Sequence, residues 1–432
     1  MLIVGHIVGM AIPFIDIAII GGGPGGLALA QGLRKNGINS AVFERDHVRA
    51  DYVQGFRLRI RQRAIDALEA NLPPHLFGAF LATVGKAPSE SLSLDENFNR
   101  IGNDGWGNDP GDAHGDKSLS RITLRQILLS ELGDIFRPGR KFECYELQSD
   151  GTVVAQFNDG SAVRANVLVG ADGINSAVRR QLLPDFRIFD TGVRRLAGKM
   201  TLAEAARRRI SPLLLDYNAG IRPSTGHRLS ITSHRVDAQA YARYGLIGAN
   251  DESHRGIAGL HFDNTTSYVW WNTAYEVGEL GPDSRLETYS GAELLEVLAD
   301  HIGHWDERIV NLIRHTDPST VAFLKVRSSE PGAVWETGPV TLLGDAIHAM
   351  TYFRALGGNS AIYDAGLLAA ELRLARRSGK PLLDALRDYE EGMRAHGYEA
   401  VRSSLSALRK NIAAGRPHKD AAVARNSAPA VQ

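Results

Sequence analysis

The chain has 432 residues, and its 49 basic side chains balance 49 acidic ones. This length is enough for two domains with their own cores, while the balanced charge gives no reason to expect nucleic acid as a partner. A single cysteine, Cys144, excludes an intrachain disulfide and a cysteine-based metal site, and the 14 histidines show no H-E-x-x-H spacing. We therefore expect no metal, and the lone thiol is compatible with a cytoplasmic location.

The first 20 residues are mostly apolar, as a membrane anchor would be. However, they carry Pro13 and Asp16, lack a basic flank, and end in a segment that also fits a buried strand. What remains is shorter than the ~20 apolar residues that span a bilayer. An anchor is therefore not expected, and residues 1–9 are expected to be a disordered extension before a start at Met10.

The first glycine motif follows a short apolar run. Residues 15–20 are typical of a buried parallel strand, and residues 27–33 continue as a helix rich in alanine and leucine. A second strand is expected over 40–43, directly before an acid. Four residues match the dinucleotide-binding fingerprint G-x-G-x-x-G with its distant acid: Gly21, Gly23, Gly26 and Glu44.

Each position of this fingerprint has its own physical task. Gly21 permits the tight turn, Gly23 lets the backbone approach a pyrophosphate, and Gly26 lets the helix pack against the strand. The helix N-terminus offers free N–H groups and the positive end of its dipole to the phosphates. Glu44 is placed to accept hydrogen bonds from an adenosine ribose. The motif therefore predicts a bound dinucleotide but does not separate FAD from NAD.

Two later glycine segments favour FAD. A strand over 163–169 leads into GADG at 170–173, and a strand over 340–343 leads into GD at 344–345, a loop and a helix over 360–376. A strand that ends in Gly-Asp places a carboxylate, here Asp345, at the carboxyl edge of a sheet, where α/β folds bind ligands. Asp345 is placed to accept hydrogen bonds from ribityl hydroxyls. The backbone N–H groups of three residues are placed to reach the polar edge of a flavin ring: Gly357, Gly358 and Asn359.

The predicted organisation is discontinuous. The expected FAD-binding domain comprises 10–80, 115–185 and 335–375, and a mainly-β substrate domain is inserted at 186–334. Strand-like runs in the insertion cover 228–232, 257–262 and 268–273. Trp270 and Trp271 must point to opposite faces of any strand that holds both. C-terminal helices are expected over 376–412, with a helical pair at 381–412, and residues 416–432 are expected to be disordered.

With these motifs, the chain resembles the group A (single-component) FAD-dependent monooxygenases, the superfamily of para-hydroxybenzoate hydroxylase, from about Ile15 to Leu408. The runs QGFRL at 54–58, SRITLR at 120–125 and GDAIHAMT at 344–351 are similar to the branch that acts in natural-product biosynthesis. The resemblance implies an α/β fold, with a Rossmann-type FAD-binding domain, an inserted mainly-β substrate domain and C-terminal helices. It also implies cofactor contacts from Glu44, Arg57, Arg121, Asp172, Asp345 and Gly358.

The implied activity is that of an oxidoreductase. NADPH or NADH would reduce FAD, and O₂ would form a flavin C4a-hydroperoxide that hydroxylates or epoxidises an aromatic, polyketide or terpenoid small molecule. The chain has no second G-x-G-x-x-G after a strand, which fits a reductant that binds transiently. Candidates for a base that keeps a phenol ionised are His227, Arg228, His234 and Tyr352. An FAD-dependent dehydrogenase or oxidase, an FAD enzyme with non-redox chemistry, and a binding module without turnover remain alternatives.

The chain departs from the family pattern in one loop. After GDAIHAMT the family has proline, two residues and then glycine, whereas this chain has Tyr352 and Ala355 at the two positions. Proline fixes φ, and glycine takes a positive φ without strain. The change is either drift in a tolerant loop or a reshaped pocket, even one without monooxygenation. We expect Tyr352 to lie against the flavin pocket, because the loop must pass the ring before the next helix.

Overall fold

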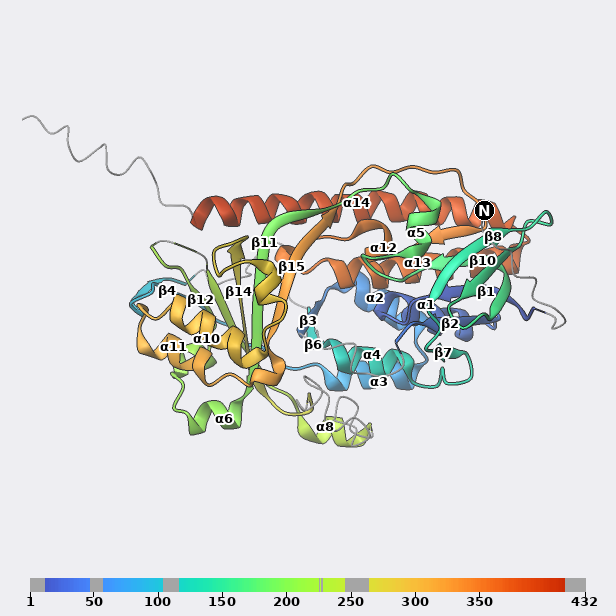
Figure 1. The fold of residues 1–432 in the computed structure, drawn as a ribbon. Helices are drawn as coiled ribbons and strands as arrows, with labels where there is room; N and C mark the ends of the chain where they lie inside the picture. The colour runs from blue at the N-terminus through green and yellow to red at the C-terminus, as the bar shows by residue number, and fades with distance from the viewer. Residues whose placement is uncertain are drawn as a thin grey trace, which may run out of the picture.

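The computed structural model describes residues 12–46, 57–103, 116–224, 226, 228–244 and 264–415, the side chains of 412–415 excepted. Four features expected from the sequence lie outside these residues: the candidate base His227, the strand over 257–262, and the extensions 1–9 and 416–432. Two sheets form two lobes, and a long C-terminal helix runs over both of them (Figure 1).

The first sheet is of the Rossmann type. Its parallel strands lie in the order β7 (Phe136–Pro138), β2 (Ser40–Glu44), β1 (Phe14–Ile20), β10 (Ala162–Gly170) and β16 (Val340–Leu342). β9 (Val153–Phe157) and β8 (Phe142–Leu147) continue it antiparallel from the first half of β10. The strands expected over 15–20, 40–43, 163–169 and 340–343 are therefore confirmed, each to within one residue of its bounds.

Helices pack beside this sheet as the apolar pattern predicts. α1 (Pro24–Lys35) contacts α2 (Gln62–Asn71), α4 (Arg121–Leu129) and α13 (Gly357–Ser378). Most of α1 is buried, including the stretch Leu27–Leu33. α1 and α13 are distant in sequence, and the burial of this continuous apolar run holds them side by side.

The second sheet is assembled from three parts of the chain. Its strand order is β15 (Ala322–Ser329), β11 (Ile188–Thr201), β14 (Tyr268–Glu276), β13 (Leu229–His234), β12 (Asn218–Ile221), β4 (Ser91–Leu94) and β5 (Arg100–Gly102). The expected range 186–334 thus holds most of this sheet, but β4 and β5 come from before residue 186. Sequence distance hides this pairing, because β4 joins β12 in parallel across more than a hundred residues.

The second sheet has one apolar face and one polar face, because side chains alternate along each strand. On the apolar face Trp271 is fully buried, and its Nε1 donates to Thr316 Oγ1 at 2.7 Å. α10 (Gly291–His301) and α11 (Glu307–Arg314) share that core. On the other face the Trp270 ring lies 5.6 Å from Arg195 Cζ. The two tryptophans therefore face opposite sides, as expected.

The C-terminal segment is one helix, α14 (Leu382–Gly415), and the helical pair expected over 381–412 is wrong. Glycine inside a helix costs about 1 kcal/mol, yet packing outweighs that cost, because Gly397 allows α14 to approach His348 closely. At 1.5 Å per residue, 34 residues extend about 50 Å. Near its start Tyr389 donates to the carbonyl oxygen of Leu342, and near its end Leu408 packs with residues of β11 and β15.

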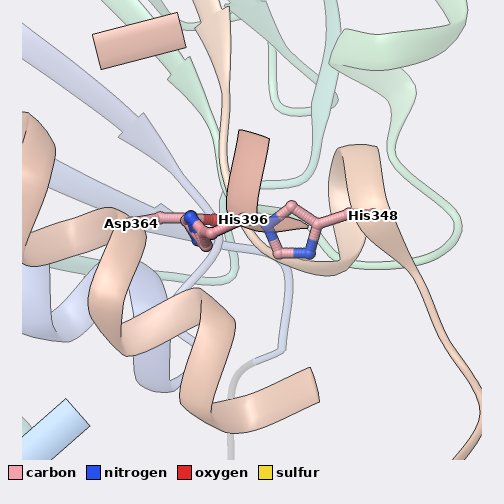
Figure 2. Close-up of side chains that lie close together, drawn as sticks. All are labelled: His348, Asp364 and His396. Atoms are coloured by element: carbon pink, nitrogen blue, oxygen red, sulfur yellow. Dashed lines mark hydrogen bonds and ion pairs between the residues drawn. The ribbon is translucent and has the colours of Figure 1, made fainter. Parts of the chain in front are cut away.

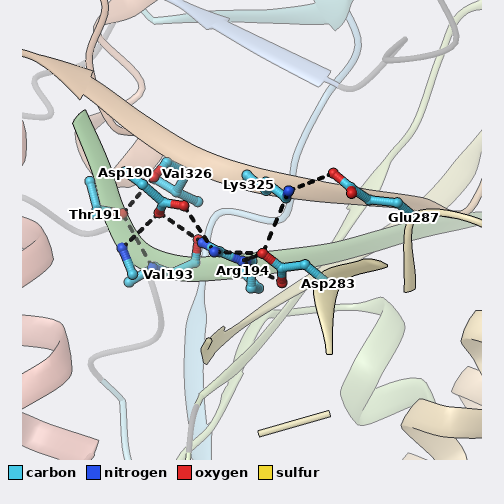
Figure 3. Close-up of polar contacts among 9 residues, drawn as sticks. Asp190, Thr191, Val193, Arg194, Asp283, Glu287, Lys325 and Val326 are labelled. Carbon is cyan, nitrogen blue, oxygen red and sulfur yellow. Dashed lines mark hydrogen bonds and ion pairs between the residues drawn. The ribbon is translucent and has the colours of Figure 1, made fainter. Parts of the chain in front are cut away.

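An ion-pair network stabilises the edge of the second sheet that β15 and β11 form (Figure 3). The register of β11 shifts between Asp190 and Val193, and Arg194 spans the irregularity by binding Asp190 and Asp283. Lys325 of β15 contacts Asp283 and Glu287. Hydrogen bonds from Arg194 to Asp283 and Asp190 raise the pKa of Arg194 above its already high ordinary value. The network therefore holds β11, β15 and α9 (Asp283–Leu286), the short helix after β14, in one arrangement.

The remaining elements are short. They are β3 (Arg57–Ile60), β6 (Lys117–Ser120), α3 (Pro74–Thr83), α5 (Ala177–Leu182), α6 (Leu202–Arg207), α7 (Pro212–Leu215), α8 (Ala238–Arg243), α9 (Asp283–Leu286), α12 (Asp345–His348), η3 (Pro318–Thr320) and η4 (Tyr352–Arg354). Within the described ranges no helix combines the length and the apolar character needed to cross a bilayer.

Candidate cofactor site

The turn between β1 and α1 has the geometry that the glycine motif predicts. Gly21 has φ +112, and its N–H donates to the carbonyl oxygen of Phe43 at 2.8 Å. A methyl group on Gly21 would lie 2.4 Å from the carbonyl oxygen of Ala171, and one on Gly26 would lie 2.1 Å from that of Gly21. A methyl group on Gly23 would meet no atom within 4 Å. Packing within the chain therefore requires Gly21 and Gly26, whereas Gly23 faces open space, as a pyrophosphate cradle would.

Glu44 lies at the end of β2 and is buried. Its Oε2 accepts from the N–H of Gly22 at 2.7 Å, and its Oε1 accepts from the N–H of Asp46 at 3.1 Å. Glu44 thus fixes the glycine turn itself. Each carboxylate oxygen can accept a second hydrogen bond, so the expected contact with a ribose remains a prediction.

A cavity of about 300 Å³ opens where the three glycine segments meet. Its lining residues come from the turn after β1, from the end of β2, from α4, from the GADG segment, from β15 and from the GD segment: Pro24, Arg45, Asp46, Arg121, Ile122, Arg125, Gln126, Asp172, Gly173, Ile174, Asn175, Arg327 and Asp345. The structure therefore brings Arg121, Asp172 and Asp345 together beside the glycine turn. The four arginines among these residues suit the negative charge of a pyrophosphate.

Asp172 joins the cavity to α5. Its Oδ2 accepts from the N–H of Ala177 at 2.7 Å, at the start of that helix. Its Oδ1 is buried and has no hydrogen-bond partner among the described residues. Burial raises the pKa of Asp172 above its ordinary value. A buried acceptor without a partner costs about 1–3 kcal/mol, so this atom fits a hydroxyl donor on a ligand.

Asp345 projects into the cavity from a tight turn. Gly344 has φ +63, and its N–H donates to Asp364 Oδ2 at 2.7 Å. Asp345 is exposed in the absence of a ligand, and it lines the cavity. Removal from bulk water raises the pKa of Asp345, while the charges of His348 and Arg121 oppose this rise. When ionised, the carboxylate can accept hydrogen bonds from hydroxyl groups of a ligand in the cavity.

The two glycines that begin α13 do not line the cavity, although Gly357 lies next to Asp345. A methyl group on Gly357 would lie 3.6 Å from Asp345 Oδ1, and one on Gly358 would lie 3.7 Å from Leu58 Cδ2. The side chain of Asn359 is used within the protein: Oδ1 accepts from the N–H of Arg61, and Nδ2 donates to the carbonyl oxygens of Arg59 and Ala355, all at 2.7 Å. The expected flavin contact of these three residues rests on their backbone and stays a prediction.

The structure does not bring Arg57 to the cavity, in contrast to its expected cofactor contact. Its Nε donates to Ser118 Oγ, and its Nη1 donates to Thr232 Oγ1 of the second sheet at 3.3 Å. Arg57 therefore points to the polar face of that sheet, because the β3–β6 pair lies between the two lobes.

The candidate bases are spread over the polar face rather than gathered. The carbonyl oxygen of Arg228 accepts from Thr273 Oγ1 at 3.0 Å, at the opposite end of β13 from His234. His234 is fully buried, and burial, Arg57 and Lys199 lower the pKa of His234 to about 3. A histidine with this pKa is neutral at pH 7 and is a weak base.

Tyr352 packs between the second sheet and α14, and it does not line the 300 Å³ cavity. Its ring stacks on Phe353 at 4.5 Å, and Arg195 Cζ lies 4.2 Å from the ring centroid. Burial raises the pKa of Tyr352 to about 12, although Arg195 opposes the rise. The phenol is therefore protonated at neutral pH, which makes it a hydrogen-bond donor and a poor base. A contact with the flavin stays a prediction.

The sequence analysis missed Lys199 on β11. Lys199 is buried, its Nζ lies 3.3 Å from Asn264 Oδ1, and it lies 5.0 Å from the centre of the Tyr268 ring. Burial lowers the pKa of Lys199 to about 7, within reach of a general base. No local motif marks this residue, because its neighbours come from a strand and a loop more than sixty residues further along the chain.

Ala355 has a backbone conformation that glycine would adopt without strain. Ala355 has φ +51 and ψ +34, the left-handed conformation that costs about 1–2 kcal/mol for a residue with a side chain. We expect Ala355→Gly to raise the free energy of unfolding of the apo-protein by roughly 0.5–1 kcal/mol, since glycine also gains entropy in the unfolded chain. Urea titration measures this. As a control, Ala407→Gly within α14 should lower the free energy of unfolding by about 1 kcal/mol. A lower free energy of unfolding in both variants would contradict strain at Ala355.

The comparisons with known proteins agree with this geometry. The family described as an FAD binding domain matches residues 15–70 and 309–404. A dual O-methyltransferase/FAD-dependent monooxygenase of Phaeosphaeria nodorum is 28% identical over 382 residues, which are 82% of this chain and 40% of that protein. Zeaxanthin epoxidase of Oryza sativa subsp. japonica is 27% identical over 394 residues, 87% of this chain and 52% of that protein. The chain thus spans about half the length of these curated relatives.

Solved structures share the whole fold. A candidate FAD containing monooxygenase of Photorhabdus luminescens has a TM-score of 0.75 at 28% identity and covers 92% of this chain and 99% of its own. HpxO of Klebsiella pneumoniae, solved with FAD and uric acid, has a TM-score of 0.69 at 20% identity, covering 95% of this chain and 91% of its own. At that identity the likeness concerns the fold alone.

Proposed function

We propose, from the premise that this chain belongs to the family of FAD-dependent monooxygenases, that it uses NAD(P)H and O₂ to insert one oxygen atom into a small organic molecule. The observation that carries this proposal is the cavity where the glycine turn, Asp172 and Asp345 meet. The open space at Gly23 and the unpartnered Oδ1 of Asp172 fit a dinucleotide with hydroxyl groups.

FAD, when bound, supplies the redox chemistry by taking two electrons from NAD(P)H and passing them to O₂. Overall, one oxygen atom enters the substrate, and the other leaves as water with the hydrogen of NAD(P)H and one proton. The chain's own residues hold the cofactor. Gly23 and the start of α1 would receive the pyrophosphate, Glu44 the adenosine ribose, and Asp345 the ribityl hydroxyls, while Arg121 offsets negative charge.

We infer that the polar face of the second sheet forms the wall of the substrate site. Hydrogen-bonding side chains follow one another across β4, β13, β14 and β11 on this face, and all are buried: Ser93, Ser230, Thr232, His234, Asn272 and Lys199. Such a polar wall favours a substrate with phenol, enol or ketone groups over a hydrocarbon, because these groups can exchange hydrogen bonds with the wall. A hydroxylated aromatic polyketide fits this chemistry better than a carotenoid.

Lys199 is the group on this face that suits the ionisation of a phenol. Its pKa of about 7 allows a neutral amine to take the phenol proton near neutral pH, and the resulting ammonium would stabilise the phenolate. Coupled turnover is therefore expected to rise as pH increases through about 7. In Lys199→Met the rise of coupled turnover with pH should disappear. Coupled turnover should also fall about 100-fold, within the range for loss of general-base catalysis.

The test measures NAD(P)H oxidation by the yellow, FAD-containing protein with a polyhydroxylated aromatic substrate and, separately, with a carotenoid. Product that is sixteen mass units heavier, formed from the aromatic substrate only, supports both the activity and the substrate class. Hydrogen peroxide in place of oxygenated product would favour the oxidase alternative, which the substitutions at Tyr352 and Ala355 keep open. Substrate conversion without NAD(P)H would favour non-redox chemistry, and colourless protein that cannot take up FAD would overturn the assignment.

A further inference from the structure

One row of residues with small side chains, or none, crosses the polar face of the second sheet. Residues paired across neighbouring strands point to the same face, so the strand register defines the row. The rows on either side hold longer side chains, with Arg195 in one and Lys199 and Trp270 in the other. The sheet therefore has the least bulk along this row, which from β15 to β4 consists of Ala322, Ala197, Asn272, Ser230, Gly220 and Ser93.

Asn272 lies in the middle of this row and is 4% exposed, while its cross-strand neighbour Ser230 is 7% exposed. Along β14 the nearest residues on the same face are Trp270 and Ala274. In the described part of the chain, no hydrogen bond joins the side chain of Asn272 or Ser230 to another residue. A buried amide thus stands among small side chains with its donor and its acceptor unused.

The neighbouring polar side chains on this face are engaged with the protein. Thr232 donates to Asn218 Oδ1 at 2.5 Å, and Arg57 donates to Thr232 Oγ1 at 3.3 Å. The Nζ atom of Lys199 lies 3.3 Å from Asn264 Oδ1. Buried polar groups are normally paired in this way, and each exception calls for a partner. For Asn272 and Ser230 that partner is a ligand.

A buried polar cluster in the other lobe shows the contrast (Figure 2). Asp364 of α13 lies below the turn at Gly344, and its Oδ2 accepts from the N–H of Gly344 at 2.7 Å. The same oxygen lies 2.6 Å from His348 Nε2 of α12. The protein itself uses this carboxylate to fix the turn, whereas it makes no such use of the Asn272 amide.

The chemistry of an amide indicates what it would bind. An asparagine side chain presents one donor and one acceptor next to each other. Two hydroxyl groups on neighbouring ring carbons satisfy both, because one accepts and the other donates. Lys199 and Asn272 are diagonal neighbours on adjacent strands, a separation of about 7–8 Å. One aromatic ring can therefore contact both residues.

We propose that Asn272, together with Ser230, determines the specificity of the substrate site. The amide binds two neighbouring hydroxyl groups of a flat aromatic ring and presents that ring to Lys199, while the small side chains of the row give the ring a surface to lie against. This proposal rests on the proposed function, because it takes the polar face as the wall of the substrate site. Its test measures ligand binding, so it does not depend on the formation of product.

The experiment measures, by calorimetry, the binding of two naphthalenediol isomers to the FAD-containing protein. One isomer carries its hydroxyl groups on neighbouring carbons, and the other carries them on different rings. We expect the wild type to bind the first isomer about tenfold more tightly, and Asn272→Leu to bind both isomers with the weaker affinity. In Ser230→Ala the preference should fall to about threefold, because one of the two polar partners remains.

Thr273→Val is the matched control, one position along β14 and on the opposite face of the sheet. The Thr273 hydroxyl donates to the carbonyl oxygen of Arg228 at 3.0 Å, so its loss should lower the free energy of unfolding and leave the preference between the isomers unchanged. Asn272→Leu should show the opposite pattern. It removes an amide without a protein partner, so the free energy of unfolding should stay the same or rise, while the preference is lost.

Equal affinity of the wild type for the two isomers overturns the proposal, and so does an unchanged preference in Asn272→Leu. A wild type that binds neither isomer overturns the substrate class. If Asn272→Leu fails to fold, Ser230→Ala decides, since an unchanged tenfold preference in that variant contradicts the proposal. Oxygenation is scored separately, from product mass with NAD(P)H and O₂. A missing product would count against the proposed function and leave the isomer preference as it was measured.

Discussion

Apo-protein with Gly26→Ala is expected to lose about 3 kcal/mol of unfolding free energy and to bind FAD at least 100-fold more weakly. The added methyl group would lie 2.1 Å from the carbonyl oxygen of Gly21. Because that oxygen belongs to backbone and not to a flexible side chain, α1 must move away from β1. The helix N-terminus then no longer points at the position of the pyrophosphate. Chemical denaturation and FAD titration measure the two effects.

Gly23→Ala is the matched control for this variant. Gly23 has φ −78, which alanine adopts without strain, and its methyl group would meet no protein atom within 4 Å. We therefore expect apo-protein stability to stay within about 0.5 kcal/mol of the wild type, while FAD binding weakens because the methyl group enters the cradle. Unchanged FAD affinity in Gly23→Ala would mean that the pyrophosphate does not lie at this turn.

Asp345→Asn is expected to weaken FAD binding by about 10- to 100-fold, the range for loss of hydrogen bonds to a charged group. The same variant should stabilise the apo-protein at neutral pH. The folded protein raises the pKa of Asp345, so ionisation of this carboxyl opposes folding as pH rises from its unfolded pKa through its folded pKa. Asparagine removes this opposition, and the gain should vanish at low pH, where Asp345 is protonated in both states.

These opposite effects separate a ligand-binding carboxylate from a structural one. If Asp345 only capped the turn before α12, Asp345→Asn would lower apo-protein stability and leave the affinity for FAD at the wild-type value. Asp384→Asn at the exposed start of α14 removes the same charge far from the cavity and should change neither quantity by a measurable amount.

The cofactor side of the fold could be predicted from the sequence because its determinants are local. Gly21, Gly23 and Gly26 lie within six residues, and each glycine meets the neighbour, or the open space, that the motif requires. The Gly-Asp turn at Gly344 likewise carries its own conformation, with φ +63. Strand bounds were accurate to one residue, since parallel strands buried by helices are continuous apolar runs.

The second sheet and its surroundings were less accessible to sequence reasoning, because their contacts are distant along the chain. Arg57 turns towards Thr232, 175 residues away, and no pattern near Arg57 indicates this partner. Lys199 owes its lowered pKa to burial that only the assembled sheet provides. The helical pair expected at 381–412 failed for a similar reason, because contacts with the first lobe and with β15 keep α14 continuous through Gly392 and Gly397.

The position of α14 in the chain also sets the order of events during synthesis. Trp335, Thr337 and Thr341 all donate to Glu390 of α14, so β16 and the segment before it are tied to this helix. β16 and α14 leave the ribosome after all the remaining strands of both sheets. The nucleotide-binding lobe therefore stays incomplete until these two elements have been synthesised. Pairings between such distant segments form slowly. We therefore expect FAD to enter a nearly finished chain, and nascent protein released before residue 382 to remain without cofactor.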